Sequence, residues 1–400
     1  MVAAEGPYGR RLVLILGALS AFGPLSVDFY LPGLQKLTRD FGTSASAGQL
    51  TLTACILGLA FGQLVLGPLS DRFGRRPPLL AGLALYCAAS LACAVAPSVW
   101  VLVGLRLVQG LSGAAGIVIA RSIVRDLVSG AAAARLFSVI MLVLGVVPIL
   151  APVFGGQLLQ VTSWRGLFVI LAAVDGAILA ATALWLRETL PPERRRSSGE
   201  SGAAFAQLFR DRFFLAYAIV LGLTFAALFS YIAGSSFVLQ DLYGVSPQLY
   251  GGLFGLNAFG IVACAQLNRM LVGRVLPERL LFVGVVAQAA AGVTLLAVVL
   301  VGGVGLPGVL PCLFVTVASL GLVVPNASAL ALTDYPHAAG SASALLGTIQ
   351  FALGGAVAPL VGIAGKGTAL PMGLMVAVFG VGGLIACGVA RRAVPVLVAA

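Results

Sequence analysis

The sequence predicts an all-α membrane protein whose twelve transmembrane helices form two six-helix bundles, with both chain termini cytoplasmic. Three observations support this fold class: 60% of the 400 residues are hydrophobic, only 9% are charged, and long apolar runs recur along the whole chain. Soluble domains carry roughly 25% charged residues, and a chain so poor in charge cannot cover a large water-facing surface. The composition therefore excludes a large soluble catalytic domain.

Each apolar run is long enough to cross the hydrocarbon core of a bilayer, which takes about 20 residues of helix. Charged residues, Gly and Pro interrupt the runs and set the span boundaries. The predicted spans are residues 11–33, 48–70, 78–96, 100–120, 136–158, 165–186, 212–239, 249–270, 280–301, 306–328, 341–364 and 369–390. An even number of spans places both termini on one side of the membrane.

The basic residues fix the predicted orientation. The net charge is +11, with 24 basic and 13 acidic residues. All but five of the basic residues fall in segments that are cytoplasmic if both termini are; the exceptions are Lys36, Arg39, Arg106, Arg165 and Lys366. This asymmetry is the positive-inside pattern of membrane proteins, so the positive charge does not indicate a nucleic-acid partner.

The longest hydrophilic stretch, residues 187–211, separates the sixth predicted span from the seventh and contains two prolines and three consecutive arginines. We interpret it as a cytoplasmic linker. It divides the chain into an N-terminal six-helix bundle (1–186) and a C-terminal one (212–400). Two such halves are expected to be related by an axis along the membrane normal, with any substrate site between them near the midplane.

A compact motif lies in the predicted cytoplasmic turn after the second span, where residues 67–76 read GPLSDRFGRR. Gly67 lets a neighbouring helix approach, Asp71 can accept hydrogen bonds from a facing helix N-terminus, and Gly74 permits a tight reversal. The string resembles the signature loop of the major facilitator superfamily at every defining position. The resemblance implies that fold and a role in conformational gating for Gly67, Asp71, Arg72, Gly74, Arg75 and Arg76.

Within that superfamily the chain resembles the bicyclomycin- and chloramphenicol-resistance branch of drug/proton antiporters. The strings that carry this resemblance are 27–32 (VDFYLP), 106–110 (RLVQG), 124–126 (VRD) and 187–195 (RETLPPERR). The fifth predicted span resembles the proline-glycine motif of antiporters. Its residues, interpreted as a seal between the halves, are Gly145, Pro148, Pro152, Gly155 and Gly156; a static kink is the structural alternative.

Three ionisable residues lie deep within predicted spans: Asp28, Arg106 and Asp175. An unpaired charge there is costly, so each is a candidate functional residue. Asp28 and Arg106 have similar predicted depths, and we expect them to pair across the bundle as the proton-coupling site. An ion pair that only orients the helices is the alternative. For Asp175, a packing or partly hydrated role is favoured over a second proton site.

Sparse polar residues in the spans are candidates for the substrate cavity: Tyr30, Gln109, Tyr231, Asn257, Asn326 and Gln350. Gln109 follows Arg106 by one turn on the same helix face and is the strongest of them. For the four residues of the second half, a helix-packing role is the simpler interpretation.

These features predict a proton-coupled efflux transporter of the inner membrane, and no enzyme. The family resemblance suggests small amphipathic antibiotics such as chloramphenicol, florfenicol or bicyclomycin as substrates, exchanged for protons. A proton-coupled metabolite symporter and an exporter of an endogenous small molecule are the alternatives. The six cysteines and single histidine show no metal-ligand spacing, and no phosphate-binding loop is present, so we expect no cofactor, no metal and no nucleotide. The expected partners are the substrate, protons and the lipid bilayer, with the protein a monomer.

Overall fold

The chain is helical throughout the residues that its computed structural model describes, which are 10–127, 143, 146–195, 207–302, 304–333, 335, 339–361 and 367–393. Over those ranges there is no β-strand beyond an isolated bridge between Val272 and Val275. Among these described residues, ten helices are long and apolar enough to span a membrane, or eleven if the bent pair Arg11–Ser20 and Phe22–Asp40 counts as one span. The predicted fifth span begins outside the described residues, and its described part is the shorter apolar helix Val146–Leu158.

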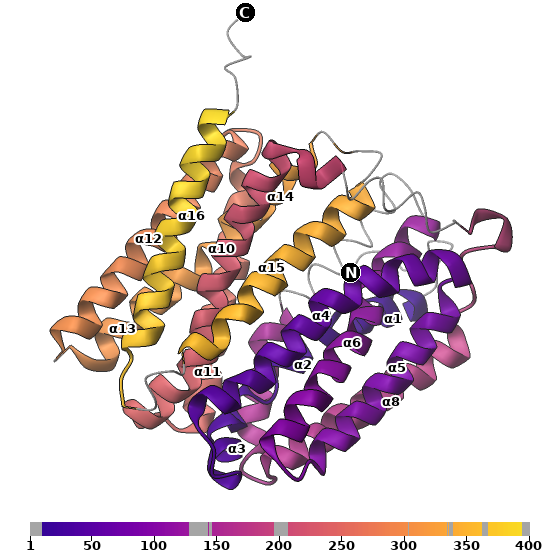
Figure 1. Cartoon of the computed structure of the whole chain (residues 1–400), viewed down its shortest axis with the longest axis horizontal. Helices are drawn as coiled ribbons and strands as arrows, with labels where there is room; N and C mark the ends of the chain where they lie inside the picture. The colour runs from indigo at the N-terminus through magenta and orange to yellow at the C-terminus, as the bar shows by residue number, and fades with distance from the viewer. Residues whose placement is uncertain are drawn as a thin grey trace, which may run out of the picture.

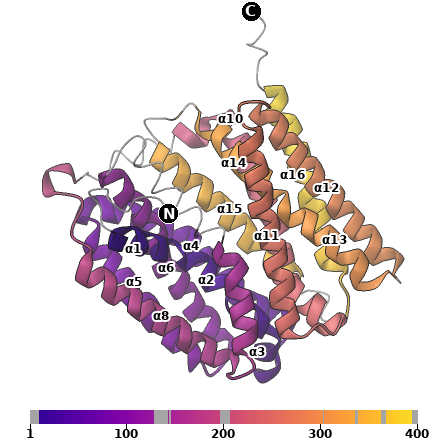
Figure 2. The ribbon, with the colours of Figure 1, turned by 180° about the vertical axis from the view of Figure 1, so that it is seen from behind.

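Figures 1 and 2 show two groups of helices side by side. The first bundle comprises α1 (Arg10–Ser20), α2 (Phe22–Asp28), the 3₁₀ turn η1 (Leu31–Gly33), α3 (Leu34–Asp40), α4 (Ala45–Phe73), α5 (Arg76–Ala94), α6 (Val99–Leu127), the helix 146–158 and α8 (Trp164–Trp185). The second comprises α10 (Arg212–Ser235), the π-helical turn η3 (Ser236–Leu242), α11 (Pro247–Leu271), α12 (Pro277–Val301), α13 (Gly305–Ala318), α14 (Leu320–Leu332), α15 (Ala339–Val361) and α16 (Leu370–Ala393).

The two bundles have their ends on the same two sides of the molecule, and we name each end of the molecule by the segments that lie there. The linker end carries the segment 67–76 and residues 186–195, and the far end carries η1, α3 and η3. In both views the ribbons of the bundles lie close together at the far end and stand farther apart at the linker end, where α16 finishes (Figures 1 and 2). The linker end is the one predicted to be cytoplasmic.

Side-chain caps start several of the long helices. Ser44, Ser163 and Ser246 each accept a hydrogen bond from a backbone N–H of the first turn of α4, α8 and α11, and Asp211 does so for α10. Caps of this kind satisfy N–H groups that have no partner within the helix. The helix starts therefore agree closely with the predicted span boundaries.

Close helix packing between α4 and α6 positions the centre of the first bundle. A Cβ added at Gly58 or Gly110 would overlap backbone atoms of the partner helix, Leu107 O and Cys55 O respectively. The expected close approach at Gly67 is absent, because a Cβ there would lie 3.5 Å from Val118 Cγ1, an ordinary contact distance. The glycines that allow the close approach of α4 and α6, Gly58 and Gly110, thus lie in the middle of the spans, and Gly110 directly follows Gln109.

Candidate functional site

Arg106 occupies the centre of the first bundle and is fully buried on α6. Its Nη2 donates to Ser26 O of α2 (2.5 Å), its Nε donates to Thr51 O of α4 (3.4 Å), and its Nη1 donates to Gln109 Oε1. Its guanidinium carbon lies 4.5 Å from the centre of the Tyr30 ring, in cation-π contact. The residue thus ties three helices together.

Each of these partners of Arg106 is uncharged. A second aromatic ring, that of Phe168 on α8, lies 5.6 Å from the guanidinium carbon. Carbonyl oxygens and ring faces stabilise a cation, but none of them carries the opposite charge. Within the described ranges, the positive charge of Arg106 therefore has no contacting anion inside the bundle. This arrangement costs free energy and favours binding or ionisation of an anionic group nearby.

Asp28 does not form the direct pair with Arg106 that we expected. It lies at the C-terminal end of α2 and is 6% exposed, and no ion pair joins it to Arg106 in the part of the chain that is described. Its carboxylate is instead within electrostatic range of Tyr231 and Tyr250 of the second bundle. The depth argument gave both residues a similar height, but Arg106 turns toward Ser26 O, two residues before Asp28.

The predicted cavity residues separate into four places. Tyr30 and Gln109 contact Arg106. In the second bundle, the Tyr231 hydroxyl accepts a hydrogen bond from Asn257 Nδ2 (2.9 Å), and both side chains are buried. Asn326 lies elsewhere and donates through Nδ2 to Asn268 Oδ1 (2.6 Å) and Leu322 O (2.7 Å), while Gln350 is half-buried on α15.

A hydrogen-bond relay leads from Arg106 to Asp175. Gln109 accepts from Arg106 through Oε1 and donates through Nε2 to Ser90 Oγ of α5 (2.7 Å). Ser90 Oγ lies 3.3 Å from Asp175 Oδ2 of α8. Asp175 is 1% exposed, so the partly hydrated environment expected for it is not found. Ser90 could not be recognised as a link from its position in the sequence, because a serine in an apolar span is common.

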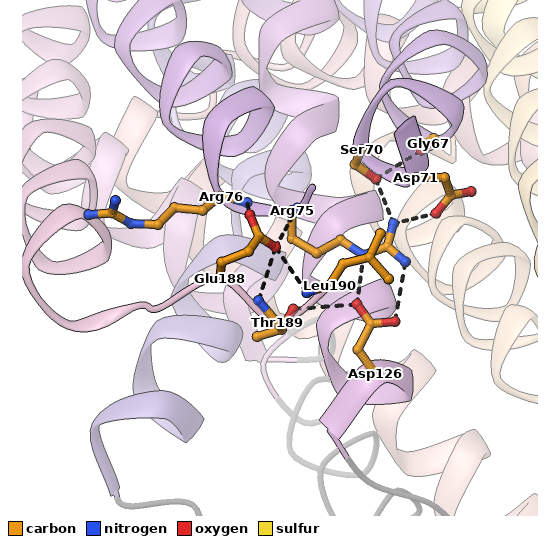
Figure 3. Close-up of polar contacts among 9 residues, drawn as sticks. All are labelled: Gly67, Ser70, Asp71, Arg75, Arg76, Asp126, Glu188, Thr189 and Leu190. Atoms are coloured by element: carbon orange, nitrogen blue, oxygen red, sulfur yellow. Dashed lines mark hydrogen bonds and ion pairs between the residues drawn. The ribbon is translucent and has the colours of Figure 1, made fainter. Parts of the chain in front are cut away.

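At the linker end, Arg75 organises the signature segment (Figure 3). Its Nε donates to Asp126 Oδ2 of α6 (2.7 Å), its Nη2 to Asp126 Oδ1 (3.2 Å), and its Nη1 to Asp71 and to Ser70 Oγ (2.9 Å). Gly74 has a φ of +94°, in the left-handed region that glycine tolerates, so the chain reverses there as predicted. The cluster joins α4, α5 and α6.

Glu188 takes the role that we had expected of Asp71. Its carboxylate accepts hydrogen bonds from Arg75 N (2.8 Å) and Arg76 N (3.1 Å) at the start of α5, and from Thr189 N and Leu190 N (both 3.0 Å). Asp71 pairs with the Arg75 side chain instead. Burial alone would raise the pKa of Glu188, but the four N–H donors lower it below its ordinary value.

The remaining signature arginines have other contacts. Arg72 is exposed, with its guanidinium carbon 5.2 Å from the Phe73 ring centre, and Arg76 Nη2 donates to Ala183 O of α8 (2.7 Å). Asp126 and Glu188 are the cluster members that the sequence analysis did not assign to the site. Both lie in strings that carry the family resemblance, 124–126 and 187–195, but those strings did not indicate their contacts.

The helix 146–158 of the first bundle faces α11 of the second bundle and continues through Pro148 and Pro152. A Cβ at Gly155 would overlap the carbonyl oxygen of Phe29, the residue that follows α2, and one at Gly156 would lie 2.6 Å from Pro247 O of α11. From the side of the second bundle, a Cβ added at Gly251 of α11 would lie 2.5 Å from Pro152 O. The backbones of the bundles are therefore in contact here; Gly145 lies outside the described residues.

Polar contacts join the bundles at the far end. An ion pair links Arg39 Nη2 to Asp241 Oδ1 (2.6 Å). The hydrogen bonds between the bundles here include Gln35 Nε2 to Ser236 O (3.0 Å), Ser236 Oγ to Leu31 O (3.1 Å), Gln49 Nε2 to Ala233 O (3.0 Å) and Gln248 Nε2 to Gly156 O (3.3 Å). The far end is thus held closed in the state described.

Comparison with known proteins agrees with this architecture. A family model described as Major Facilitator Superfamily matches residues 12–359. The Uncharacterized MFS-type transporter YdgK of Bacillus subtilis (strain 168) is 39% identical over 389 residues, which are 96% of this chain and 96% of the relative. The Bicyclomycin resistance protein homolog of Haemophilus influenzae is 32% identical over 362 residues (90% and 91%). The Chloramphenicol resistance protein of Pseudomonas aeruginosa is 31% identical over 366 residues (88% and 82%).

Among solved structures, that of a D-xylose-proton symporter matches with a TM-score of 0.72 at 17% identity, covering 96% of this chain and 97% of the other. At that identity the likeness concerns the fold alone. The apolar spans and the related transporters make this a multi-pass protein of the cell membrane. Because the family model covers most of the chain, and relatives above 30% identity span nearly its full length, the chain belongs to the major facilitator superfamily.

Proposed function

We propose that the protein is a proton-coupled exporter that exchanges protons for small amphipathic antibiotics such as chloramphenicol, florfenicol or bicyclomycin. The observation that carries the proposal is the buried guanidinium of Arg106, whose contacts among the described residues are all uncharged, while the acid Asp28 is buried near the bundle interface. The printed names of two relatives, for bicyclomycin and chloramphenicol resistance, supply the substrate class.

The carboxylate of Asp28 is placed where binding of a proton can affect the contact between the two bundles. Asp28 immediately precedes Phe29, whose carbonyl oxygen contacts Gly155. The carboxyl group of Asp28 also interacts electrostatically with Tyr231 and Tyr250 of the second bundle. An ionised carboxylate is costly there once the far end closes and excludes water. Proton binding to Asp28 from the far end therefore favours the closed far end, and proton release at the other side favours its opening.

Substrate and proton then compete through the same equilibrium. A ligand shifts a two-state protein only by its difference in affinity for the two states. A neutral amphipathic substrate that binds near Tyr30 and Gln109 touches the partners of Arg106 and alters the field that Asp28 experiences. Coupling of this kind requires no covalent chemistry and is reciprocal between the proton and the substrate.

The test is substrate export from proteoliposomes with an imposed pH gradient, using chloramphenicol, florfenicol, bicyclomycin and a sulfonamide, with a sugar and an amino acid for comparison. We expect the gradient to drive export of at least one antibiotic by the wild type. Asp28→Asn should lose the stimulation by the gradient and retain substrate binding. Asp40→Asn, which removes an exposed acid that binds Trp164 Nε1, is the matched control and should behave as wild type.

Two outcomes would contradict the proposal. Full gradient-driven export by Asp28→Asn would exclude that residue as the coupling acid. Uptake of the sugar or amino acid down the same gradient, with no antibiotic export, would identify the protein as a proton-coupled symporter instead.

A further inference from the structure

Asp175 is a second buried acid of the first bundle, and the scheme above does not use it. It lies in the middle of α8 and is 1% exposed. Its Oδ2 faces Ser90 Oγ at 3.3 Å, and its Oδ1 is buried without a hydrogen-bond partner among the residues that the structure describes. An ionised carboxylate would need several strong donors to remain in such a place. The structure offers it one hydroxyl at most.

The hydrogen bonds at Ser90 indicate which group holds the proton. Ser90 Oγ lies 2.9 Å from Tyr86 O, one turn earlier on α5, and accepts a hydrogen bond from Gln109 Nε2. A serine hydroxyl has one proton and two acceptor sites. If the hydroxyl donates to Tyr86 O, the nearer acceptor, its second acceptor site is open to a proton donated by Asp175. This assignment uses every donor and acceptor of Ser90 once.

The opposite assignment leaves the network unsatisfied. An ionised Asp175 requires Ser90 to turn its proton away from Tyr86 O toward a carboxylate oxygen 0.4 Å farther away (3.3 Å against 2.9 Å). The carboxylate would then hold a full charge with one long hydrogen bond and one oxygen without a partner. Among the described residues Oδ1 has no hydrogen-bond partner in either protonation state, but an unpaired oxygen costs much less free energy on a neutral acid than on a buried charge, so the neutral acid fits this state better.

The same relay connects Asp175 to Arg106. Gln109 uses its oxygen on Arg106 and its nitrogen on Ser90, which fixes the orientation of the amide. Arg106 contacts no anion, and Asp175 is the acid at the other end of the relay. Loss of the Asp175 proton would create an anion that faces the guanidinium through two neutral groups. The relay therefore provides a path by which the charge of one residue affects the other.

We propose that Asp175 is a second proton-binding site, protonated in the state described here and coupled to Arg106 through Ser90 and Gln109. Its link to transport rests on the proposed exporter function, but its protonation does not. On deprotonation, Ser90 redirects its hydroxyl from Tyr86 O to Asp175, and the new carboxylate compensates the charge of Arg106. The proton passes to water when the first bundle becomes hydrated on the linker side.

The other titratable groups around Asp175 do not offer an alternative partner. The titratable groups on its packing elements are Tyr86, Cys87 and Cys93 of α5 and Arg106 of α6. Arg76 of α5, Arg11 of α1 and Asp40 of α3 contact α8 toward its ends, at Ala183, Trp185 and Trp164 respectively. Arg165, on α8 itself, donates to Ala94 O and Ala96 O. The thiol of Cys87 donates to Ala172 O (3.4 Å). Arg106 is thus the charged group to which Asp175 is connected by hydrogen bonds.

Infrared spectroscopy of the purified protein at neutral pH tests the protonation directly and needs no substrate. We expect the wild-type minus Asp175→Asn difference spectrum to contain the C=O stretching band of a protonated carboxylic acid. Ser90→Ala, which retains the acid but removes its acceptor, should shift that band. Asp40→Asn is the matched control and should remove a carboxylate band. If Asp175→Asn removes a carboxylate band instead, or if Ser90→Ala leaves the spectrum unchanged, the proposal is wrong.

The coupling is tested by counting protons exchanged per substrate in proteoliposomes. Asn has the shape of a neutral Asp, so Asp175→Asn should keep the wild-type melting temperature and transport the substrate, with the proton count reduced by one. An unchanged count would overturn the coupling. If no variant and no wild type exchanges protons for any substrate, the exporter function fails while the infrared result still decides the protonation of Asp175.

Discussion

Gly251→Ala should shift the equilibrium between the closed and open far end without changing the fold of either bundle. An added Cβ at this position of α11 would lie 2.5 Å from Pro152 O of the other bundle, closer than real side chains approach a backbone oxygen. Gly252, the next residue of α11, has no atom within 4 Å of an added Cβ. Gly252→Ala is therefore a control on the same helix, one residue away.

The size of the shift depends on the free-energy changes that differ between the closed and the open far end. Replacing Gly by Ala in a helix gains roughly 1 kcal/mol, but this gain applies to both states and to both variants. Overpacking a tight contact costs about 1–3 kcal/mol, and it applies only while the bundles touch. Since about 1.4 kcal/mol is tenfold in an equilibrium constant, Gly251→Ala should lower the ratio of closed to open far end by roughly 5- to 150-fold.

Hydrogen-deuterium exchange measured by mass spectrometry reports the opening. Residues 31–42 and 236–250 form the hydrogen-bonded contact at the far end, so their amides should exchange faster in Gly251→Ala than in the wild type or in Gly252→Ala. Peptides from the linker-end halves of α12 and α16, residues 277–288 and 381–393, should be unchanged. Equal exchange in the two alanine variants would refute the reasoning, because it would mean that the backbone contact does not hold the far end closed.

Two further predictions concern local stability. The pKa of Glu188 is lowered from 4.5 on folding, so its contribution to stability is present above that pH and is lost as the pH falls; the melting temperature of Glu188→Gln should depend less on pH between about pH 6 and about pH 3 than that of the wild type. A steeper dependence in the variant would contradict the assignment. Gly110→Ala should cost about 1–3 kcal/mol because its Cβ would overlap Cys55 O, whereas Gly104→Ala on the same helix meets no atom within 4 Å and should gain up to roughly 1 kcal/mol. Thermal unfolding in detergent compares the pair, and equal midpoints would exclude tight packing at Gly110.

The helices could be predicted from the sequence because hydropathy measures the length of apolar chain directly. The predicted span 165–186 corresponds to α8 (Trp164–Trp185), and the predicted span 249–270 to α11 (Pro247–Leu271). The first span was harder to predict. Pro32 and Gly33 mark the 3₁₀ turn at its end, but its apolar run does not indicate the 41° bend after Ser20.

The candidate site was predictable in its residues and less so in its contacts. A charge within an apolar run is visible in any sequence, so Asp28, Arg106 and Asp175 were found. Their partners were not, because depth along a helix says nothing about the direction in which a side chain points. Arg106 binds a backbone carbonyl, that of Ser26, and every residue has one. The relay through Ser90 likewise depends on a contact between α5, α6 and α8 that only the fold provides.

The charges buried in the first bundle give a reason why the state described here is suited to release protons. Arg106 contributes one positive charge, and Asp28 and Asp175 contribute a negative charge only when ionised. If both acids are protonated with the far end closed, as proposed, the guanidinium has no anion to compensate it. Loss of one proton then neutralises the net positive charge of the low-dielectric interior, because one carboxylate compensates Arg106. Loss of the second proton leaves a net negative charge there. The first proton should therefore leave more readily than the second, which makes one guanidinium between two acids a device for stepwise release at the linker end.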